Sequence, residues 1–145
     1  MAKVLVIYHS QTGNTEEMAK AVSEGVSSIS GAEAVLKKAM DANVQDLFDC
    51  DAFAFGTPTY GGYMAGMVKD FFDRIAFGWV GQGQPKPFAC FGSAGGDTHE
   101  GIASIEALAT AMQLQKTADS VKATMKASPE VIEQCKTLGK TLATK

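Results

Sequence analysis

The stretch KVLVIYHSQTGNT, from Lys3 to Thr15, joins two contrasting kinds of sequence. Its first part, Val4 to Tyr8, is a continuous apolar run, as is typical of a central parallel strand covered by helices on both faces. Its second part, Ser10 to Thr15, contains three hydroxyl side chains, two amides and one glycine. Hydroxyl and backbone N–H groups can surround a phosphate, which the positive end of a helix dipole also favours. The stretch therefore predicts a buried strand, a phosphate-binding loop and a helix start.

The composition predicts one globular domain over residues 1–145. Hydrophobic residues make up 46% of the chain and charged residues 20%, which is enough apolar material for a core. The formal net charge is -3, and Arg74 is the only arginine. Because no cluster of lysine and arginine could neutralise a nucleic-acid backbone, we expect no nucleic-acid partner.

The three cysteines, Cys50, Cys90 and Cys135, are odd in number, widely spaced and set among apolar residues. This pattern indicates neither a disulfide framework nor a C-x-x-C metal site, so we expect buried, reduced thiols and no bound metal. No basic segment with a cleavage site precedes the first strand, and no apolar run approaches the length of a membrane span. We therefore expect a soluble, cytoplasmic protein with no membrane contact.

Strand-like and helix-like apolar patterns alternate along the chain. Strands are predicted at residues 4–8, 32–38, 52–55, 88–91 and 120–124. A helical segment follows each strand, and the predicted bounds include 15–28, 41–49 and 63–76. This order predicts an α/β fold, in which a single five-stranded parallel sheet carries helices on both faces.

Loops rich in small and hydroxyl residues follow three of the predicted strands. They are SQTGNT (the first loop, residues 10–15), TPTYGG (the second loop, 57–62) and SAGGD (the third loop, 93–97). Ligands of open parallel sheets bind outside the carboxyl ends of the strands, so these loops should converge on one crevice.

Several phosphate chemistries do not fit the first loop. It lacks G-x-x-x-x-G-K-[ST], which would supply a lysine to nucleotide phosphates, and it lacks the dinucleotide motif G-x-G-x-x-G. His9 and Ser10 stand where a response regulator needs acidic residues for Mg²⁺. A small cysteine phosphatase using Arg74 would need a cysteine where Val68 stands.

The three loops together resemble those of the flavodoxin family, over essentially the whole chain. The first loop resembles the family's FMN-phosphate loop, and the second and third resemble its two ring-holding loops. The resemblance implies noncovalently bound FMN and a three-layer αβα sandwich with strand order 2-1-3-4-5. The cofactor-binding residues that it implies are Ser10, Gln11, Thr12, Gly13, Asn14, Thr15, Pro58, Thr59, Tyr60, Gly61, Gly62, Ser93, Ala94, Gly95, Gly96, Asp97 and His99.

Individual residues near the implied ring site have alternative roles. Tyr60 is poorly placed for the core, whereas stacking on a flavin would bury its ring and leave its hydroxyl in water. The Gly61–Gly62 peptide is either a simple turn or a peptide that flips to hydrogen-bond the flavin N5–H after one-electron reduction. His99 is either a ring contact or an exposed residue at a helix start.

Three other residues are expected to lie away from the ring. Trp79 precedes the fourth strand, so we expect it at the opposite end of the sheet, in packing or a partner contact. Asp70 and Asp73 are expected on a solvated helix face.

Gly62 stands where many flavodoxins have an acidic residue, so the anionic hydroquinone should be repelled less strongly.

The resemblance implies an electron carrier that shuttles electrons between unidentified redox partner proteins through a stabilised semiquinone, with no catalytic residue of its own. We expect a monomer. An alternative is an NAD(P)H-dependent FMN quinone reductase, because GTPTYGGYMAGMVKDFFD at 56–73 also resembles the tryptophan-repressor-binding-protein-like quinone reductases. A third possibility is a non-redox interaction module with the same fold and no flavin.

Overall fold

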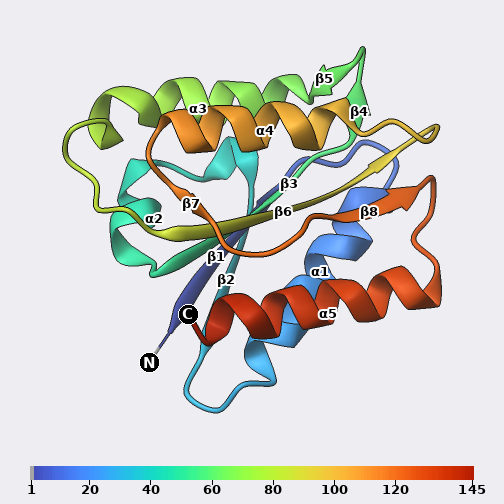
Figure 1. Cartoon of the computed structure of the whole chain (residues 1–145), viewed down its shortest axis with the longest axis horizontal. Helices are drawn as coiled ribbons and strands as arrows, with labels where there is room; N and C mark the ends of the chain where they lie inside the picture. The colour runs from blue at the N-terminus through green and yellow to red at the C-terminus, as the bar shows by residue number, and fades with distance from the viewer. Residues whose placement is uncertain (1) are drawn as a thin grey trace.

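The computed structural model describes residues 2–145 and shows a parallel sheet between two layers of helices (Figure 1). The strands of the sheet are β1 (Lys3–Tyr8), β2 (Glu33–Lys38), β3 (Ala52–Gly56), β6 (Pro87–Ala94), β7 (Gln115–Lys116) and β8 (Val121–Thr124). One face is covered by α3 (Gly66–Trp79) and α4 (Glu100–Ala111), beside the short η1 (Ala39–Asp41) and α2 (Val44–Asp49). The other face is covered by α1 (Asn14–Ser27) and α5 (Pro129–Ala143).

The strand order is β2-β1-β3-β6, and both β7 and β8 pair with β6 in parallel. These two short strands together occupy the place of the fifth strand. The predicted three-layer αβα sandwich with strand order 2-1-3-4-5 is therefore confirmed. The carboxyl ends of β1, β3, β6 and β8 lie at the same edge of the sheet, because all of these strands are parallel.

Some element boundaries differ from the prediction. Helix α3 begins at Gly66 rather than residue 63, because residues 59–64 form a small hairpin of β4 (Thr59–Tyr60) and β5 (Tyr63–Met64). Strand β6 continues through residues 92–94, which the sequence places in a loop. A Cβ at Gly92 would collide with the carbonyl oxygen of Thr57, so this small residue allows close approach rather than ending the strand.

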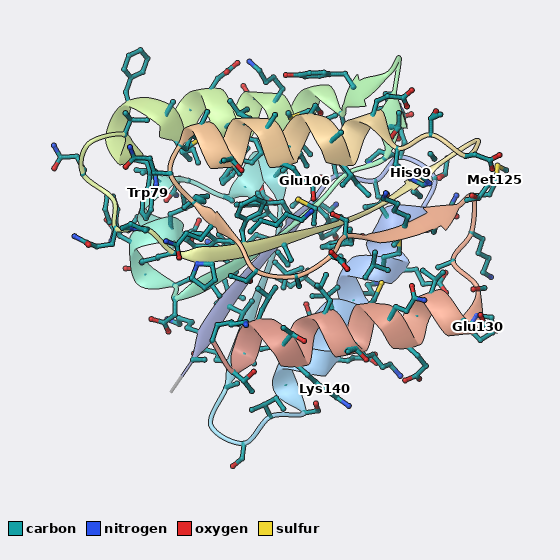
Figure 2. All side chains as sticks on the ribbon, viewed as in Figure 1. Trp79, His99, Glu106, Met125, Glu130 and Lys140 are labelled. Atoms are coloured by element: carbon teal, nitrogen blue, oxygen red, sulfur yellow. The ribbon has the colours of Figure 1, made fainter. Side chains whose placement is uncertain are left out.

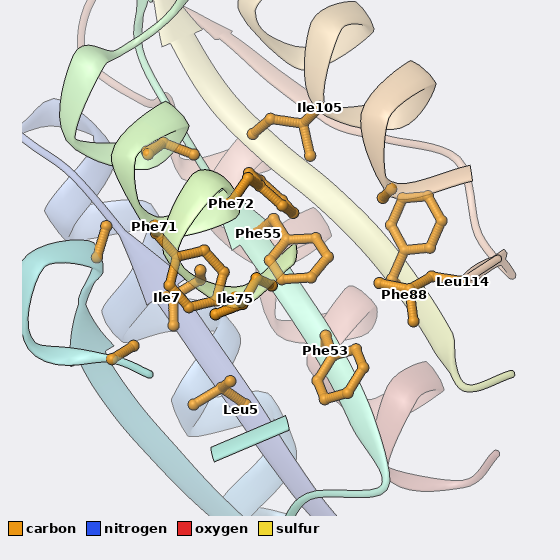
Figure 3. Close-up of a cluster of buried hydrophobic side chains, with 14 of the residues drawn as sticks. Leu5, Ile7, Phe53, Phe55, Phe71, Phe72, Ile75, Phe88, Ile105 and Leu114 are labelled. Carbon is orange, nitrogen blue, oxygen red and sulfur yellow. The ribbon is translucent and has the colours of Figure 1, made fainter. Parts of the chain in front are cut away.

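The core has one cluster on each face of the sheet, because successive side chains of a strand point in opposite directions. Leu5 and Ile7 belong to the cluster under α3 and α4, whereas Val4 and Val6 belong to the cluster under α1 and α5. Figure 3 shows the first cluster, with Phe55 at its centre. The ring centroid of Phe55 lies 5.2 to 6.4 Å from those of four other phenylalanines, Phe53, Phe71, Phe72 and Phe88.

Trp79 is a buried packing residue at the end of α3, with its ring centroid 5.0 Å from that of Phe48 and 6.2 Å from that of Phe53. Figure 2 shows it at the opposite end of the molecule from His99 and Met125, as expected. On the exposed side of the same helix, Asp70 and Asp73 form ion pairs of 2.8 and 2.7 Å with Arg74 and Lys69.

All three cysteines are free and buried. Burial raises the pKa of Cys50 to about 11 and that of Cys135 to about 12, and it also raises the pKa of Cys90. These thiols are therefore protonated and unreactive at neutral pH. Separately, no helix within residues 2–145 is both long enough and apolar enough to cross a membrane.

Helices α1 and α5 approach each other closely at two glycines. A Cβ at Gly25 would collide with the carbonyl oxygen of Lys136, and a Cβ at Gly139 would collide with that of Val22. The two backbones are therefore in direct contact, and this contact fixes the axis of the helix that the first loop precedes.

Candidate functional site

A pocket of about 190 Å³ opens at the carboxyl ends of the strands. Figure 2 shows this end of the molecule, where His99 and Met125 are labelled. All three predicted loops contribute to the pocket. Its lining consists of Gln11, Thr12, Asn14, Pro58, Thr59, Tyr60, Ser93, Ala94, Gly95 and Met125.

The first loop leaves the start of α1 open to an anion. The hydroxyl of Ser10 accepts a hydrogen bond of 3.0 Å from the backbone N–H of Gly13. Gly13 is the N-cap of α1 and provides no side-chain cap, so no cap side chain accepts from the backbone N–H groups of the first turn. Together with the hydroxyl and amide side chains of the loop, these donors suit a phosphate.

Behind the pocket, the first loop is joined to the end of β6 by a buried pair of hydroxyls. The Oγ1 atom of Thr15 lies 2.9 Å from the Oγ atom of Ser93. Within residues 2–145, the buried polar side chains are Thr15, Thr57 and Ser93, and each belongs to a different one of the three loops. Each of the three loops thus contributes one buried hydroxyl group.

The second loop is held by Thr57 and by the hairpin that follows it. The Thr57 hydroxyl donates to the carbonyl of Pro58 at 2.7 Å and accepts from the backbone N–H of Ala65 at 2.9 Å. Gly61 and Gly62 have φ values of +58° and +76°, as both central residues of a type I′ hairpin turn require. The glycine pair therefore forms a turn here, while the peptide flip remains a prediction.

The hairpin is anchored on the start of α4. The hydroxyl of Thr59 accepts a hydrogen bond of 3.0 Å from the backbone N–H of Gly101, and that of Ser104 accepts one of 3.1 Å from Met64. Tyr60 lies on the pocket side of this hairpin, and 36% of its surface remains exposed. A half-exposed ring at the pocket wall is available for stacking on a flat ligand.

The third loop contributes less to the pocket than the resemblance implies. Ser93 and Ala94, at the end of β6, and Gly95 line it, whereas His99 occupies the N-cap position of α4 outside the lining. Burial and the neighbouring charge of Lys122 lower the pKa of His99, and its Nδ1 atom is buried without a partner among the described residues. The other implied residues outside the lining are Ser10, Gly13, Thr15, Gly61, Gly62, Gly96 and Asp97.

Met125 lines the pocket but carries no motif that identifies it from the sequence. It directly follows β8, and its backbone N–H donates to the carbonyl of Ala94 at 2.7 Å. Its side chain is 60% exposed. Its position immediately after a predicted strand is the one signal that places it at this edge of the sheet.

The fold and the pocket define a doubly wound α/β protein with a pocket at the first strand–helix junction. The chain matches the family model described as flavodoxin over residues 6–125. A curated flavodoxin from Aquifex aeolicus (strain VF5) is 41% identical over 96 residues, which cover 66% of this chain and about half (52%) of that relative. The chain belongs to the flavodoxin family.

Solved structures show the same similarity. A flavodoxin from the domain Archaea is 26% identical with a TM-score of 0.86, and the match covers 98% of this chain and 96% of that chain. A flavodoxin, WrbA-like protein from Agrobacterium tumefaciens is also 26% identical, with a TM-score of 0.85 and coverage of 99% and 96%.

Flavodoxins bind FMN, and the residues of this pocket fit that cofactor. The uncapped start of α1 and the hydroxyl and amide side chains of the first loop can bind a phosphate monoester without a cationic side chain. Tyr60, Pro58 and Met125 provide apolar walls for a flat ring. The residues of this pocket are therefore chemically suited to FMN, the cofactor of the family.

Proposed function

We propose that this chain carries single electrons between redox partner proteins, with FMN bound in the pocket of the three loops. The composition of the pocket lining supports this proposal: Tyr60 is its only residue with an ionisable side chain. Such a pocket can bind and orient a cofactor but supplies little acid–base chemistry. Bound FMN supplies the redox chemistry, and the protein determines its position and exposure.

Each loop then has a separate task. The first loop binds the phosphate with hydroxyl groups and the N–H groups of the first turn of α1. In the second loop, Tyr60 would stack on the ring, and the Gly61–Gly62 peptide could offer its carbonyl as a hydrogen-bond acceptor to the ring. In the third loop, Ala94 and Gly95 would border the ring on its other side.

The proposal predicts that the one-electron-reduced form of the bound flavin accumulates during reduction. Purified protein loaded with FMN should be reduced stepwise without oxygen while its visible absorbance is recorded. A long-wavelength band that rises and then falls is the expected result. Direct passage from the oxidised to the fully reduced spectrum would contradict the carrier function.

The second candidate is a two-electron NAD(P)H-dependent quinone reductase. It is favoured by the similarity to the WrbA-like protein and by the sequence of residues 56–73. Rapid oxidation of NAD(P)H in the presence of a quinone, without the long-wavelength band, would support it. Protein that takes up no FMN would contradict both functions and favour an interaction module.

The location of the protein is inferred from its cysteines, and its partners are inferred from the exposed residues of the pocket. Three free, buried cysteines support a reducing compartment such as the cytoplasm. The partners are proposed to be redox proteins that approach the exposed side of Tyr60 and Met125, where the ring edge would be accessible.

A further inference from the structure

The hydrogen bond between Thr15 and Ser93 joins residues that are far apart in the sequence and almost fully buried. Thr15 lies in the first turn of α1 and is 1% exposed, while Ser93 lies near the end of β6 and is 5% exposed. Their hydroxyl oxygens are 2.9 Å apart, and either oxygen can be the donor in this pair. The direction of the hydrogen bond thus depends on what else each hydroxyl contacts.

The number of protons that each hydroxyl can donate determines which of Thr15 and Ser93 is the donor once a phosphate is bound. A hydroxyl group has one proton to donate, although it can accept two hydrogen bonds. The unprotonated oxygens of a phosphate monoester can only accept hydrogen bonds. If Thr15 donates its proton to the phosphate, the proton between Thr15 and Ser93 must come from Ser93.

We infer that Ser93 is a positioning residue for FMN phosphate. Its hydroxyl donates to Oγ1 of Thr15 and thereby directs the Thr15 proton toward the first loop. This inference rests on the proposed role of the first loop. A hydroxyl that accepts a hydrogen bond is also a better donor, so the pair strengthens the contact with the phosphate.

The surroundings of Ser93 make it suitable for this task. Its strand pairs with β8 opposite Ala123, and the preceding Gly92 lies directly against the backbone of Thr57. Ser93 is therefore held by β8 on one side, and the residue before it packs against the second loop. Among the described residues, Thr15 provides its only side-chain hydrogen bond.

The inference has a consequence for ligand selection. The Thr15–Ser93 pair acts on the phosphate, so it should favour FMN over riboflavin, which has the same ring and no phosphate. A residue that only shapes the pocket or contacts the ring would instead change the affinity for both flavins. The ratio of the two affinities therefore shows whether Ser93 positions the phosphate or only shapes the pocket.

The test measures binding of FMN and riboflavin to the apoprotein by quenching of flavin fluorescence. Ser93→Ala should weaken FMN binding about 3- to 10-fold, as expected for the loss of one hydrogen bond, and should change riboflavin binding little. Thr15→Val should also lower the ratio of the affinity for FMN to the affinity for riboflavin. The double variant Thr15→Val/Ser93→Ala should have the same affinity ratio as Thr15→Val alone.

Thr57→Val is the matched control, because it also removes a buried hydroxyl of the site but one that does not contact Thr15. Thr57→Val should weaken the binding of FMN and of riboflavin to a similar degree. Thermal unfolding of each apoprotein shows that the variant is folded, and Thr15→Ser, which retains the hydroxyl, should retain most of the FMN preference.

The outcomes distinguish the inference from the proposed function. Equal loss of FMN and riboflavin binding in Ser93→Ala, or independent effects of the two substitutions on the ratio, would overturn the positioning role alone. Wild-type protein that binds the two flavins equally would show that the first loop does not bind phosphate, and the proposed site would fail with it.

Discussion

The hydroxyl of Tyr8 donates a hydrogen bond of 2.7 Å to Oε2 of Glu16, across the first loop. This contact joins the end of β1 to the first turn of α1. It also draws an acidic side chain toward the strand, in a turn where a carboxylate would otherwise compete with a bound anion for the helix N-terminus. The loop is thus closed at its base by two residues outside its motif.

Burial and the hydrogen bond to Glu16 raise the pKa of Tyr8 from its usual value of 10.0 to about 12. Because the folded-state pKa is the higher one, its contribution to stability is complete below pH 10 and is lost as the pH rises to about 12. The advantage of wild type over Tyr8→Phe in unfolding free energy should shrink by on the order of 2 kcal/mol across this range. Urea unfolding at a series of alkaline pH values measures it. A pH-independent difference would contradict the assignment.

Phe55 should be among the most sensitive core positions, because it is fully buried among four other phenylalanine rings. Phe55→Ala should lower the unfolding free energy by about 3–5 kcal/mol. The control is Phe77→Ala, since Phe77 is 97% exposed and its replacement should change stability by less than about 0.5 kcal/mol. Denaturant unfolding of both variants measures these changes. Similar losses of unfolding free energy in Phe55→Ala and Phe77→Ala would contradict the burial of Phe55 in the core.

Glu106 joins α4 to the interrupted fifth strand. Burial alone would raise the pKa of its carboxyl, but hydrogen bonds from Lys116 and Ser120, both 2.8 Å, outweigh burial and lower it. The stability that depends on this carboxylate is present above its unfolded pKa and is lost as the pH falls through the folded pKa. Glu106→Gln should therefore cost about 1 kcal/mol at neutral pH and progressively less in acid.

Unfolding of wild type and Glu106→Gln at neutral and acidic pH measures this effect, with Ser120→Ala as a control that removes one of the two hydrogen bonds. The control should cost less than Glu106→Gln. A difference between wild type and Glu106→Gln that grows in acid would show that the lowered pKa is wrongly attributed to these contacts.

Gly62 offers a test of charge near the flavin. Its φ of +76° suits asparagine and aspartate better than other side chains, so Gly62→Asn and Gly62→Asp should both fold. The two side chains have nearly the same shape and differ in charge. The potential for adding the second electron should be lower in Gly62→Asp than in Gly62→Asn by on the order of 50 mV, because the carboxylate repels added negative charge. Equal potentials in a redox titration would place this hairpin away from the ring.

The central part of the fold was predictable because its apolar runs are long. Val4 to Tyr8 and residues 52–55 can only be buried strands in an alternating α/β pattern, and the order of elements then determines the parallel sheet. The position of the first loop at the pocket was also predictable, since hydroxyl and amide residues cluster there more densely than one helix cap requires.

Short elements escaped prediction because they carry no periodicity. Gln115 and Lys116 are both exposed, and their strand depends on pairing with β6 rather than on their own side chains. The hairpin at 59–64 similarly depends on the two positive φ angles of its turn and on contacts with α4. Met125 joins the pocket through the path of the backbone after β8, which residue type does not encode.

The direct contact of α1 and α5 at Gly25 and Gly139 links the position of the first loop to residues that lie outside the pocket. Any side chain at these positions would push the helices apart and would be expected to shift the first turn of α1, whose backbone N–H groups have no side-chain cap. Loss of cofactor through such a substitution would be an effect of displaced donors in a protein that remains folded. If FMN binds at the start of α1, its affinity should depend in part on this contact between α1 and α5, on the opposite face of the sheet from α3 and α4.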